Sequence, residues 1–474
     1  MTILIATIGT RDLMYQIQSG EWYNVGDDRL QNGQIIGEQF EVIDDLGLNP
    51  EEYGNYRPLT EYIWSERELL IDQLKPVIIG KLLLDKAQEL SHVYLVVTNQ
   101  NEEVEPRKKD TIFAGKIIKY WLEKLNNNLQ VTIINLGENN ENPSDFEQIF
   151  KWWQTTWREH IKVNNQEKII LCLKGGVGQT SEAARISGLS LYGEQIEFYE
   201  FQQHKTNRQG IPSPYLGPFL GTNYLWDRVR KESLQLLENY NYAAVEEILK
   251  PYFQQDTKLW SSTPTLIKAS IFWQQGRFES FYNLAKQSLP QRTKYWMAYE
   301  QAYTAIVRIE QQNTTEAMLH SFRSVEGLIL EWLKENYSQY ITHYQPNQYP
   351  KLKKTISQEF SNLNLDFQGK NEIILQGWQQ IELIKTVLPN LLNNQDFQAF
   401  INTRDWRNTL SHNLGGIGEQ DLFKAWGVNN LQEWKKRLIK CLNAITQENY
   451  SSLYQASLFA CLHHQVKEKI AKMI

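Results

Sequence analysis

Residues 1–12 have the sequence MTILIATIGTRD, an apolar run that ends abruptly in glycine, threonine, arginine and aspartate. The run from Ile3 to Ile8 has the length of one buried strand. Near-continuous apolar strands are typical of parallel sheets that helices cover on both faces. The polar residues that follow belong to a loop at the carboxyl end of the strand, where open α/β sheets bind their ligands. This stretch therefore predicts the first strand of an α/β sheet with a ligand-binding loop behind it.

The same pattern recurs along about the first 205 residues. Further strands are predicted at His92 to Thr98, Val131 to Leu136, Lys168 to Leu173 and Gln195 to Phe201. Helical periodicity fills the intervals, at Leu59 to Leu90, Thr111 to Leu125, Ser144 to Trp157 and Gln179 to Tyr192. Strands that alternate with helices predict a Rossmann-like N-terminal domain, a parallel sheet with helices on both faces.

The segment GIPSPYLGPFLG, from Gly210 to Gly221, is rich in proline and glycine, which indicates a linker. From Tyr224 onward the pattern is helical, with no convincing strand. The sequence therefore predicts an α/β domain over residues 1–209, a linker over 210–223 and an all-α region over 224–474. Helical hairpins at about 225–300 suggest an insert of unknown role within that region.

Three polar loops follow strands of the first domain, and all should lie at the carboxyl edge of the sheet. Glycines there allow close approach of backbone to phosphate, and a helix N-terminus adds free N–H groups and partial positive charge. Threonine, arginine, asparagine and lysine side chains supply further donors. The candidate ligand-binding residues are Gly9, Thr10, Arg11, Asp12, Thr98, Asn99, Lys174, Gly175, Gly176 and Gln179.

The third loop, Lys174 to Thr180 (KGGVGQT), differs by one residue from the deviant phosphate loop KGGxGKT of some ATPases. Gln179 stands where that loop carries the lysine that contacts the terminal phosphates. An ATPase would therefore lack the charge that its catalysis requires. A tight strand-to-helix turn without a ligand is another interpretation. Binding of an anion or nucleotide, without triphosphate hydrolysis, agrees best with the sequence.

Together, a strand ending in Gly-Thr-x-Asp, a strand ending in Leu-x-x-Thr and a late Gly-Gly turn resemble the nucleotide-sensing CARF domain. The resemblance covers about the first 200 residues. It implies that these loops, paired across a homodimer, bind cyclic oligoadenylate as an allosteric activator. The matching positions are Gly9, Thr10, Arg11, Asp12, Thr98, Asn99, Gly175 and Gly176. The family often has Thr-Lys after the glycine pair, whereas this chain has Val-Gly-Gln, which leaves the contacts of this loop and any cleavage of the activator open.

In the helical region, residues 403–416 have the sequence TRDWRNTLSHNLGG. At about 100° per residue, Trp406, Leu410 and Leu414 should form an apolar stripe that faces the core. Asn408 and His412 then fall on the opposite face. The candidate catalytic residues are Arg407, Asn408 and His412, with Arg404 and Ser411 as supporting residues. An ordinary surface histidine at position 412 is the alternative.

Arg-Asn-x-x-x-His on a helix that stops at Gly-Gly resembles the active-site motif of HEPN ribonucleases. The residue types suit RNA cleavage without metal, because the RNA supplies its own 2′-hydroxyl nucleophile. Histidine titrates near neutrality, arginine offers a fixed fork to phosphate oxygens, and Asn408 could orient the imidazole. The expected products carry a 2′,3′-cyclic phosphate and a 5′-hydroxyl.

Arg407 and His412 lie about 140° apart on one ideal helix, so one helix presents them poorly to one phosphate. A symmetric dimer would bring two copies of the motif together, and the HEPN resemblance implies such a composite site. An earlier segment, Ser321 to Ile329, resembles the HEPN helix that packs against the motif helix. Arg323 and Glu326 within it are either partners that support the motif residues or simply a salt-bridged pair at spacing i, i+3, and we favour the salt-bridged pair.

Composition and charge make some classes of function less suitable for this protein. A net charge of −6 argues against a protein that binds nucleic acid through its overall charge. Basic clusters at Arg107 to Lys109, Lys351 to Lys354 and Lys435 to Arg437 are interpreted as solvated faces. The cysteines show no zinc spacing, so no metal is expected. No signal sequence or membrane span is recognised, which predicts a cytoplasmic protein.

The sequence as a whole resembles a CRISPR-associated CARF–HEPN ribonuclease. The resemblance implies a homodimer that cyclic oligoadenylate activates to cleave single-stranded RNA in type III CRISPR antiviral defence, with no stable partner protein. The alternative is a non-catalytic nucleotide-sensing regulator whose helical domain binds a protein or RNA.

Overall fold

The structure, a computed structural model, describes residues 2–26, 30–31, 34–35, 37–164, 167–202, 205–342, 348–412 and 414–473. Its contacts divide the chain into two compact units, Met1–Asp227 and Arg228–Ile474. Within these described ranges, no helix has the length and apolar character that crossing a membrane requires.

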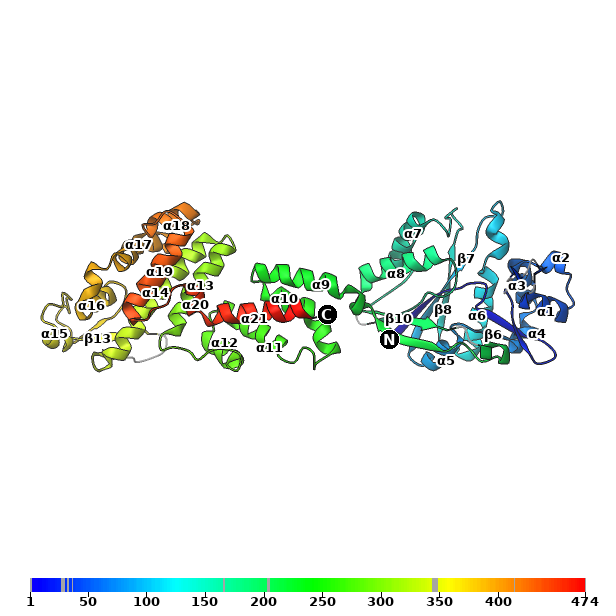
Figure 1. Cartoon of the computed structure of the whole chain (residues 1–474), viewed down its shortest axis with the longest axis horizontal. Helices are drawn as coiled ribbons and strands as arrows, with labels where there is room; N and C mark the ends of the chain where they lie inside the picture. Colours follow the sequence, from blue (N-terminus) through cyan, green and yellow to red (C-terminus); the bar gives the residue numbers. More distant parts are fainter. Residues whose placement is uncertain are drawn as a thin grey trace. The chain divides into compact units, whose positions relative to one another are not determined.

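The first unit is built on a six-stranded sheet (Figure 1). Its strands are β1 (Thr2–Thr7), β7 (Leu90–Thr98), β8 (Gln130–Leu136), β9 (Lys168–Cys172), β10 (Ile196–Phe201) and β11 (Tyr215–Leu220). Their order is β11-β10-β9-β1-β7-β8, and every neighbouring pair is parallel except β10 with β11. All five predicted strands are present, and the predicted Rossmann-like fold is confirmed.

Helices cover both faces of this sheet. On one face, Leu4 and Ala6 of β1 share a core with side chains of α3 (Tyr56–Ser65), α5 (Gly80–Lys86) and α6 (Ile112–Leu125). On the other face, Ile3 and Ile5 share a core with α7 (Phe146–Glu159) and α8 (Gly178–Tyr192). The strand β1 is buried on both sides, which explains its uninterrupted apolar sequence.

Smaller elements surround the sheet. A three-stranded sheet has the order β3-β2-β6, and β4 pairs with β5. The bounds are β2 (Leu13–Gln16), β3 (Trp22–Asn24), β4 (Leu30–Gln31), β5 (Gln34–Ile35), β6 (Leu74–Pro76), α1 (Glu38–Asp45), α2 (Pro50–Tyr53), α4 (Arg67–Leu70), η1 (Ile71–Gln73), η2 (Glu105–Lys109) and η3 (Lys205–Gln209).

The prediction of a linker over 210–223 is wrong. Residues of that segment form β11, the antiparallel edge strand, with Phe198 opposite Phe219 and Glu197 opposite Leu220. Proline lacks an N–H donor, but an edge strand pairs on one side only and tolerates it. The strand runs directly into α9 (Gly221–Glu238), so the sheet of the first unit extends beyond residue 209.

The second unit is mainly helical, as predicted. Its remaining helices are α10 (Tyr242–Gln255), α11 (Thr263–Gln274), α12 (Phe278–Ala285), α13 (Trp296–Glu310), α14 (Thr314–Asn336), α15 (Ile356–Glu359), α16 (Trp378–Val387), α17 (Gln395–His412), α18 (Glu419–Ala425), α19 (Leu431–Thr446), α20 (Leu453–Ala456) and α21 (Leu458–Lys472), with η4 (Ser338–Tyr340) and η5 (Pro389–Asn393). A small antiparallel sheet is additional to the prediction. Its order is β12 (Ile341–Thr342), β13 (Lys351–Lys353) and β14 (Glu372–Ile374).

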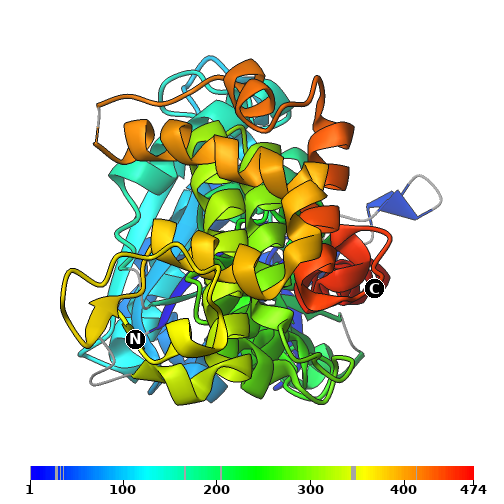
Figure 2. The same cartoon turned by 90° about the vertical axis from the view of Figure 1, so that its left-hand side faces the viewer.

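Within this unit, α14 lies beside α17 in both views (Figures 1 and 2), and Phe322 of α14 stacks on Phe400 of α17 with ring centroids 4.9 Å apart. The last helix, α21, returns to the helices that follow residue 225. Trp273 of α11 stacks on Phe459 of α21 at 3.7 Å between centroids. The helices at about 225–300 therefore share a core with the C-terminal helix.

A buried carboxyl group holds that arrangement together. Glu300 of α13 is fully buried and accepts hydrogen bonds from Trp273 Nε1 (2.7 Å) and Ser457 Oγ (2.8 Å). The backbone N–H groups of Leu458 (2.5 Å) and Phe459 (3.4 Å) also donate to it. These two groups belong to the first turn of α21, where helix N–H groups have no partner within the helix. Glu300 thus caps α21 from a helix more than 150 residues earlier.

We predict that Glu300→Ala lowers the free energy of unfolding by about 3 kcal/mol or more, because it leaves buried donors without an acceptor. Glu300→Gln keeps an acceptor oxygen and should cost less. Denaturant unfolding of the full chain measures both changes. The matched control is Glu247→Ala, at an exposed position of α10, which should stay within about 0.5 kcal/mol of the parent. Equal losses in the alanine variants would contradict the role given to Glu300.

Candidate functional site

The first candidate site lies at the centre of the sheet of the first unit. The chain places β7 and β8 on one side of β1, then crosses to place β9 and β10 on the other. The order therefore reverses between β1 and β9, which pair directly. In open α/β sheets, ligands bind outside the carboxyl ends of the strands at such a reversal. The loops after β1 and β9 are the two that meet there.

Glycines allow these two loops to touch. A Cβ atom on Gly9 would lie 2.6 Å from the backbone nitrogen of Gly176. One on Gly175 would lie 2.3 Å from the carbonyl oxygen of Thr7 and 2.4 Å from a carboxylate oxygen of Asp12. Gly176 has a φ of +83°, a conformation that side chains disfavour. These glycines therefore serve first to pack backbone against backbone.

Asp12 lies beneath the loops rather than on their surface. Its side chain is fully buried, and its Oδ2 accepts a hydrogen bond of 2.6 Å from the backbone N–H of Gly9. Burial raises the pKa of this carboxyl to about 7, and the hydrogen bond from Gly9 opposes the rise. Asp12 thus fixes the shape of the first loop, with its carboxyl group buried rather than exposed to solvent.

A cavity of about 330 Å³ opens between the two loops, at the lower end of the volumes that hold small ligands. Seven predicted residues line it, namely Gly9, Thr10, Arg11, Asp12, Lys174, Gly175 and Gly176. Three others complete the lining, Ile78, Phe201 and Ser213. Sequence reasoning missed these three because they are ordinary apolar and small residues, and Ser213 lies in the supposed linker.

The start of α8 adds an anion-binding feature beside the cavity. The helix begins at Gly178 after Val177, whose side chain has no polar atom to cap it. Its first N–H groups therefore remain available to a negatively charged ligand. Gln179 and Lys174 are exposed, but Gln179 does not belong to the lining of the cavity.

The two remaining predicted residues are engaged elsewhere. Asn99 accepts a hydrogen bond from Arg57 Nη1 and donates one to Glu138, both at 3.0 Å. The same nitrogen of Arg57 lies 3.0 Å from the buried carboxylate of Asp110. Thr98 and Thr111 exchange hydrogen bonds between their backbone N–H groups and hydroxyls (3.0 and 3.1 Å). The structure thus places Thr98 and Asn99 in a network at the end of β7, outside the lining of the cavity.

The second candidate site is the motif on α17. The stripe predicted to face the core does not do so, because Leu414 is fully exposed and Trp406 and Leu410 are only half-buried. The buried face instead carries Phe397, Ala399, Phe400 and Thr403. Arg407 follows Thr403 by four residues, and Thr403 follows Phe400 by three, so Arg407 lies on the same face of the helix. Arg407 is therefore half-buried against α14.

Three neighbours hold the Arg407 guanidinium. It lies 5.0 Å from the ring centroid of Phe322, donates to Glu326 Oε2 at 3.2 Å and donates to Asn408 Oδ1 at 3.0 Å. Our interpretation of Glu326 as the partner of Arg323 is therefore wrong, because the structure pairs Glu326 with Arg407 across two helices. The earlier helix supplies a direct contact to the motif.

The other motif residues lie toward the end of α17. His412 is exposed at its last residue. Asn408 contacts Arg407, and Ser411 Oγ donates to the carbonyl oxygen of Arg407 at 3.0 Å. Arg404, one turn before Arg407, reaches toward Gly377, with Nη2 4.0 Å from the position of an added Cβ. Asn413 of the motif lies outside the described residues.

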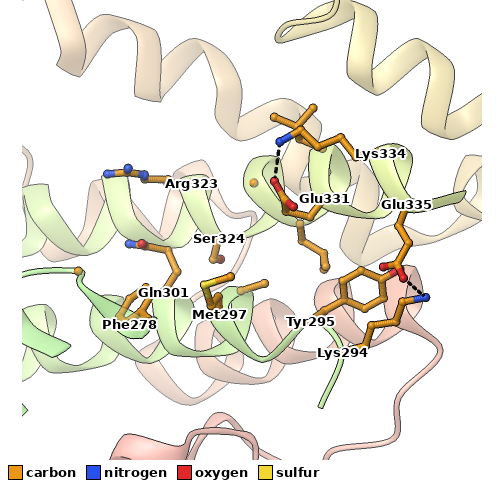
Figure 3. A pocket seen from close by; sticks show the side chains of 15 residues that line it. Phe278, Lys294, Tyr295, Met297, Gln301, Arg323, Ser324, Glu331, Lys334 and Glu335 are labelled. Atoms are coloured by element: carbon orange, nitrogen blue, oxygen red, sulfur yellow. Dashed lines mark hydrogen bonds and ion pairs between the residues drawn. The ribbon is translucent and has the colours of Figure 1, made fainter. Parts of the chain in front are cut away.

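A larger cavity of about 570 Å³ lies along α13 and α14 (Figure 3). Four of its charged residues form two ion pairs, Lys294 with Glu335 at 2.7 Å and Lys334 with Glu331 at 2.8 Å, and Arg323 also lines the cavity. It contains none of the predicted site residues. In the described ranges, no group of three or more His, Cys, Asp and Glu side chains is arranged to hold a metal ion.

No protein-family model matches the chain, and no curated protein matches it in sequence. A solved structure does match: Enterococcus italicus Csm6 bound to cyclic hexa-2'-fluoro-hexa-dAMP. The similarity covers 99% of this chain and 100% of that chain, with a TM-score of 0.60 and 14% sequence identity.

The chain has the fold of Csm6. At the level of the fold, this confirms the resemblance to CARF–HEPN proteins that the two sets of motifs indicate. Because the Csm6 match spans the whole chain, it includes both the sheet with its cavity and the helical unit with the motif.

We predict that Gly175→Ala destabilises the first unit and abolishes ligand binding there, because the new methyl group overlaps the backbone of β1 and the Asp12 carboxylate. Thermal unfolding and calorimetric titration with cyclic hexa-adenylate measure the two effects. Gly178→Ala is the matched control, since a Cβ there meets nothing within 4 Å. Similar behaviour of the two variants would show that the loops do not touch as described.

The raised pKa of Asp12 predicts a pH dependence of stability. The pKa of this carboxyl rises from 3.8 to about 7 on folding, so the protonated form stabilises the folded state. Its contribution to the free energy of unfolding is complete below about pH 4. That contribution, on the order of 4 kcal/mol, is lost as the pH rises to about 7. Asp12→Asn should remove this decline while keeping the contact to Gly9. Unfolding followed from pH 4 to 8 tests it, and parallel curves for parent and variant would contradict it.

Proposed function

We propose that this chain is a metal-independent endoribonuclease that cyclic oligoadenylate activates, and that it cleaves single-stranded RNA in type III CRISPR antiviral defence. The observation that carries the proposal is the arrangement on α17, where Arg407 is held in place by α14 and His412 stands exposed one and a half turns later. The cavity at the sheet reversal supports a nucleotide ligand as the activator. The similar Csm6 structure holds a cyclic oligonucleotide, which agrees with a ligand of this class for the first unit.

The chemistry follows from the residue types. The 2′-oxygen of the RNA attacks the adjacent phosphorus, the 5′-oxygen leaves, and a 2′,3′-cyclic phosphate and a 5′-hydroxyl result. His412 is suited to carry the proton between these oxygens, because imidazole titrates near neutrality. Arg407 is suited to stabilise charge on the phosphate oxygens. Glu326, Phe322 and Asn408 restrict the guanidinium to one position before substrate arrives.

One chain presents these groups in different directions. Arg407 lies on the face that packs against α14, whereas His412 is exposed at the end of the helix. A homodimer with two motif helices side by side would let one RNA phosphate meet residues of both copies. The activator can shift the protein toward that arrangement only if the activator binds the active arrangement more tightly than the inactive arrangement.

The test is to incubate the purified protein with labelled single-stranded RNA in EDTA, with cyclic tri-, tetra- or hexa-adenylate or none. We expect cutting with one ring and a cyclic phosphate at the new 3′ ends. Arg407→Ala and His412→Ala should each lower the rate by about a hundredfold or more, as loss of an acid–base or phosphate-binding group does.

His464→Ala, which changes an exposed histidine of α21, is the matched control and should cut at the parent rate. Absence of cutting with every ring, by protein shown to be folded and dimeric, would exclude the nuclease. The result would then favour a nucleotide-sensing regulator.

A further inference from the structure

The small sheet of the second unit and the segments beside it carry exposed side chains that a folded protein usually buries. Tyr349, Ile374 and Trp378 are 65%, 48% and 44% exposed. They are close in the fold, because the backbone N–H of Leu375 donates to the carbonyl oxygen of Pro350 at 2.8 Å. That bond places the residue before β13 beside the chain that leads from β14 into α16. The backbones of Tyr349 and Trp378 therefore lie at the same end of the β13–β14 pair.

Lysines lie on the outward side of the same sheet. On β13, Leu352 is buried, so the half-buried Lys351 and Lys353 lie on the opposite face, where Lys353 Nζ donates one hydrogen bond to the carbonyl oxygen of Gln339 at 3.0 Å. The register sets Lys351 opposite Ile374. On α16, Lys385 Nζ lies 5.4 Å from the ring centroid of Trp378. The cluster Lys351 to Lys354, interpreted from sequence as a solvated face, thus lies next to exposed aromatic rings.

This surface, the "basic aromatic face" of Tyr349, Lys351, Lys353, Ile374, Trp378 and Lys385, is continuous with the motif helix. Arg404 Nη2 lies 4.0 Å from the position of an added Cβ on Gly377, the residue before Trp378. Arg404 precedes Arg407 by one helical turn. Figure 1 shows β13, α16 and α17 at the same end of the second unit. Glu372 and Glu382 also lie among these residues, so the face combines both charges with a basic excess.

We propose that the basic aromatic face binds single-stranded RNA and leads it to the motif on α17, with Trp378 stacking on a base. The proposal rests on the proposed function, for which it names the substrate subsite. Every base has an aromatic face, so stacking on tryptophan is tolerant of sequence. Lysines beside the ring contact the phosphates on either side of the stacked base. Arg404 joins this subsite to the reacting phosphate.

RNA fits this face better than a protein partner does. A protein interface of stable size is depleted of lysine and relies on a buried apolar centre. Here lysines accompany the exposed apolar side chains, Lys351 at Ile374 and Lys385 at Trp378. The local basic excess also explains how a chain with a net charge of −6 could bind a polyanion.

The experiment uses the full-length chain with His412→Ala, which stops cleavage, and a fluorescein-labelled single-stranded RNA in the presence of cyclic hexa-adenylate. Fluorescence anisotropy gives the affinity. Adding Trp378→Ala should weaken binding about tenfold, and Trp378→Phe less than about threefold, because phenylalanine still stacks. Lys351→Gln with Lys353→Gln should lower the slope of log affinity against log salt by about 1.4, because each phosphate that a lysine neutralises contributes about 0.7.

Tyr454→Ala, which removes a 58% exposed ring from α20, is the matched control and should leave RNA affinity unchanged. Equal affinities for Trp378→Ala and Tyr454→Ala would overturn the proposal. So would loss of the dimer in Trp378→Ala, measured by light scattering, since the face would then contact a second copy. If the chain with His412 intact binds RNA through this face but does not cut it, the proposed nuclease function fails while this inference stands.

Discussion

The contact between the loops after β1 and β9 is the constraint on which the proposed nucleotide site depends. Backbone meets backbone there, with Gly9 against Gly176 and Gly175 against Thr7, and no Cβ fits at either place. The Asp12 carboxyl group lies below and ties the first loop through the N–H of Gly9. The cavity between the two loops lies beside this contact and is lined by residues of both.

A comparable constraint shapes the second unit. Phe397 and Phe400 bury one face of α17, and the same face delivers Arg407 to α14 two to three turns later. An arginine at the end of a buried face needs a partner for its charge, and Glu326 supplies it. The motif arginine is therefore fixed by core packing, whereas His412 lies past the last buried residue and projects into solvent.

Positive charge is concentrated at particular sites in this protein. The chain is acidic overall, yet Lys174 and the uncapped start of α8 lie at the cavity, and lysines lie on the basic aromatic face of the second unit. The fully buried carboxyl group of Asp12 accepts a hydrogen bond from the backbone N–H of Gly9, and that of Glu300 accepts hydrogen bonds from the backbone N–H groups of Leu458 and Phe459. Polar groups in the interior thus position the elements that carry the sites.

The sequence by itself determined the alternation of strands and helices, because strands buried on both faces must be apolar throughout and the loops at their ends are polar. It also determined which residue types stand at each loop and in the motif of α17. It could not determine which of those residues share a cavity. Gly9 to Asp12 and Lys174 to Gly176 do, whereas Thr98 and Asn99 bond to Thr111 and Arg57, and only the tertiary structure decided this. The edge strand β11, the pairing of Glu326 with Arg407 and the buried face of α17 were likewise decided by contacts between distant residues, which local periodicity does not record.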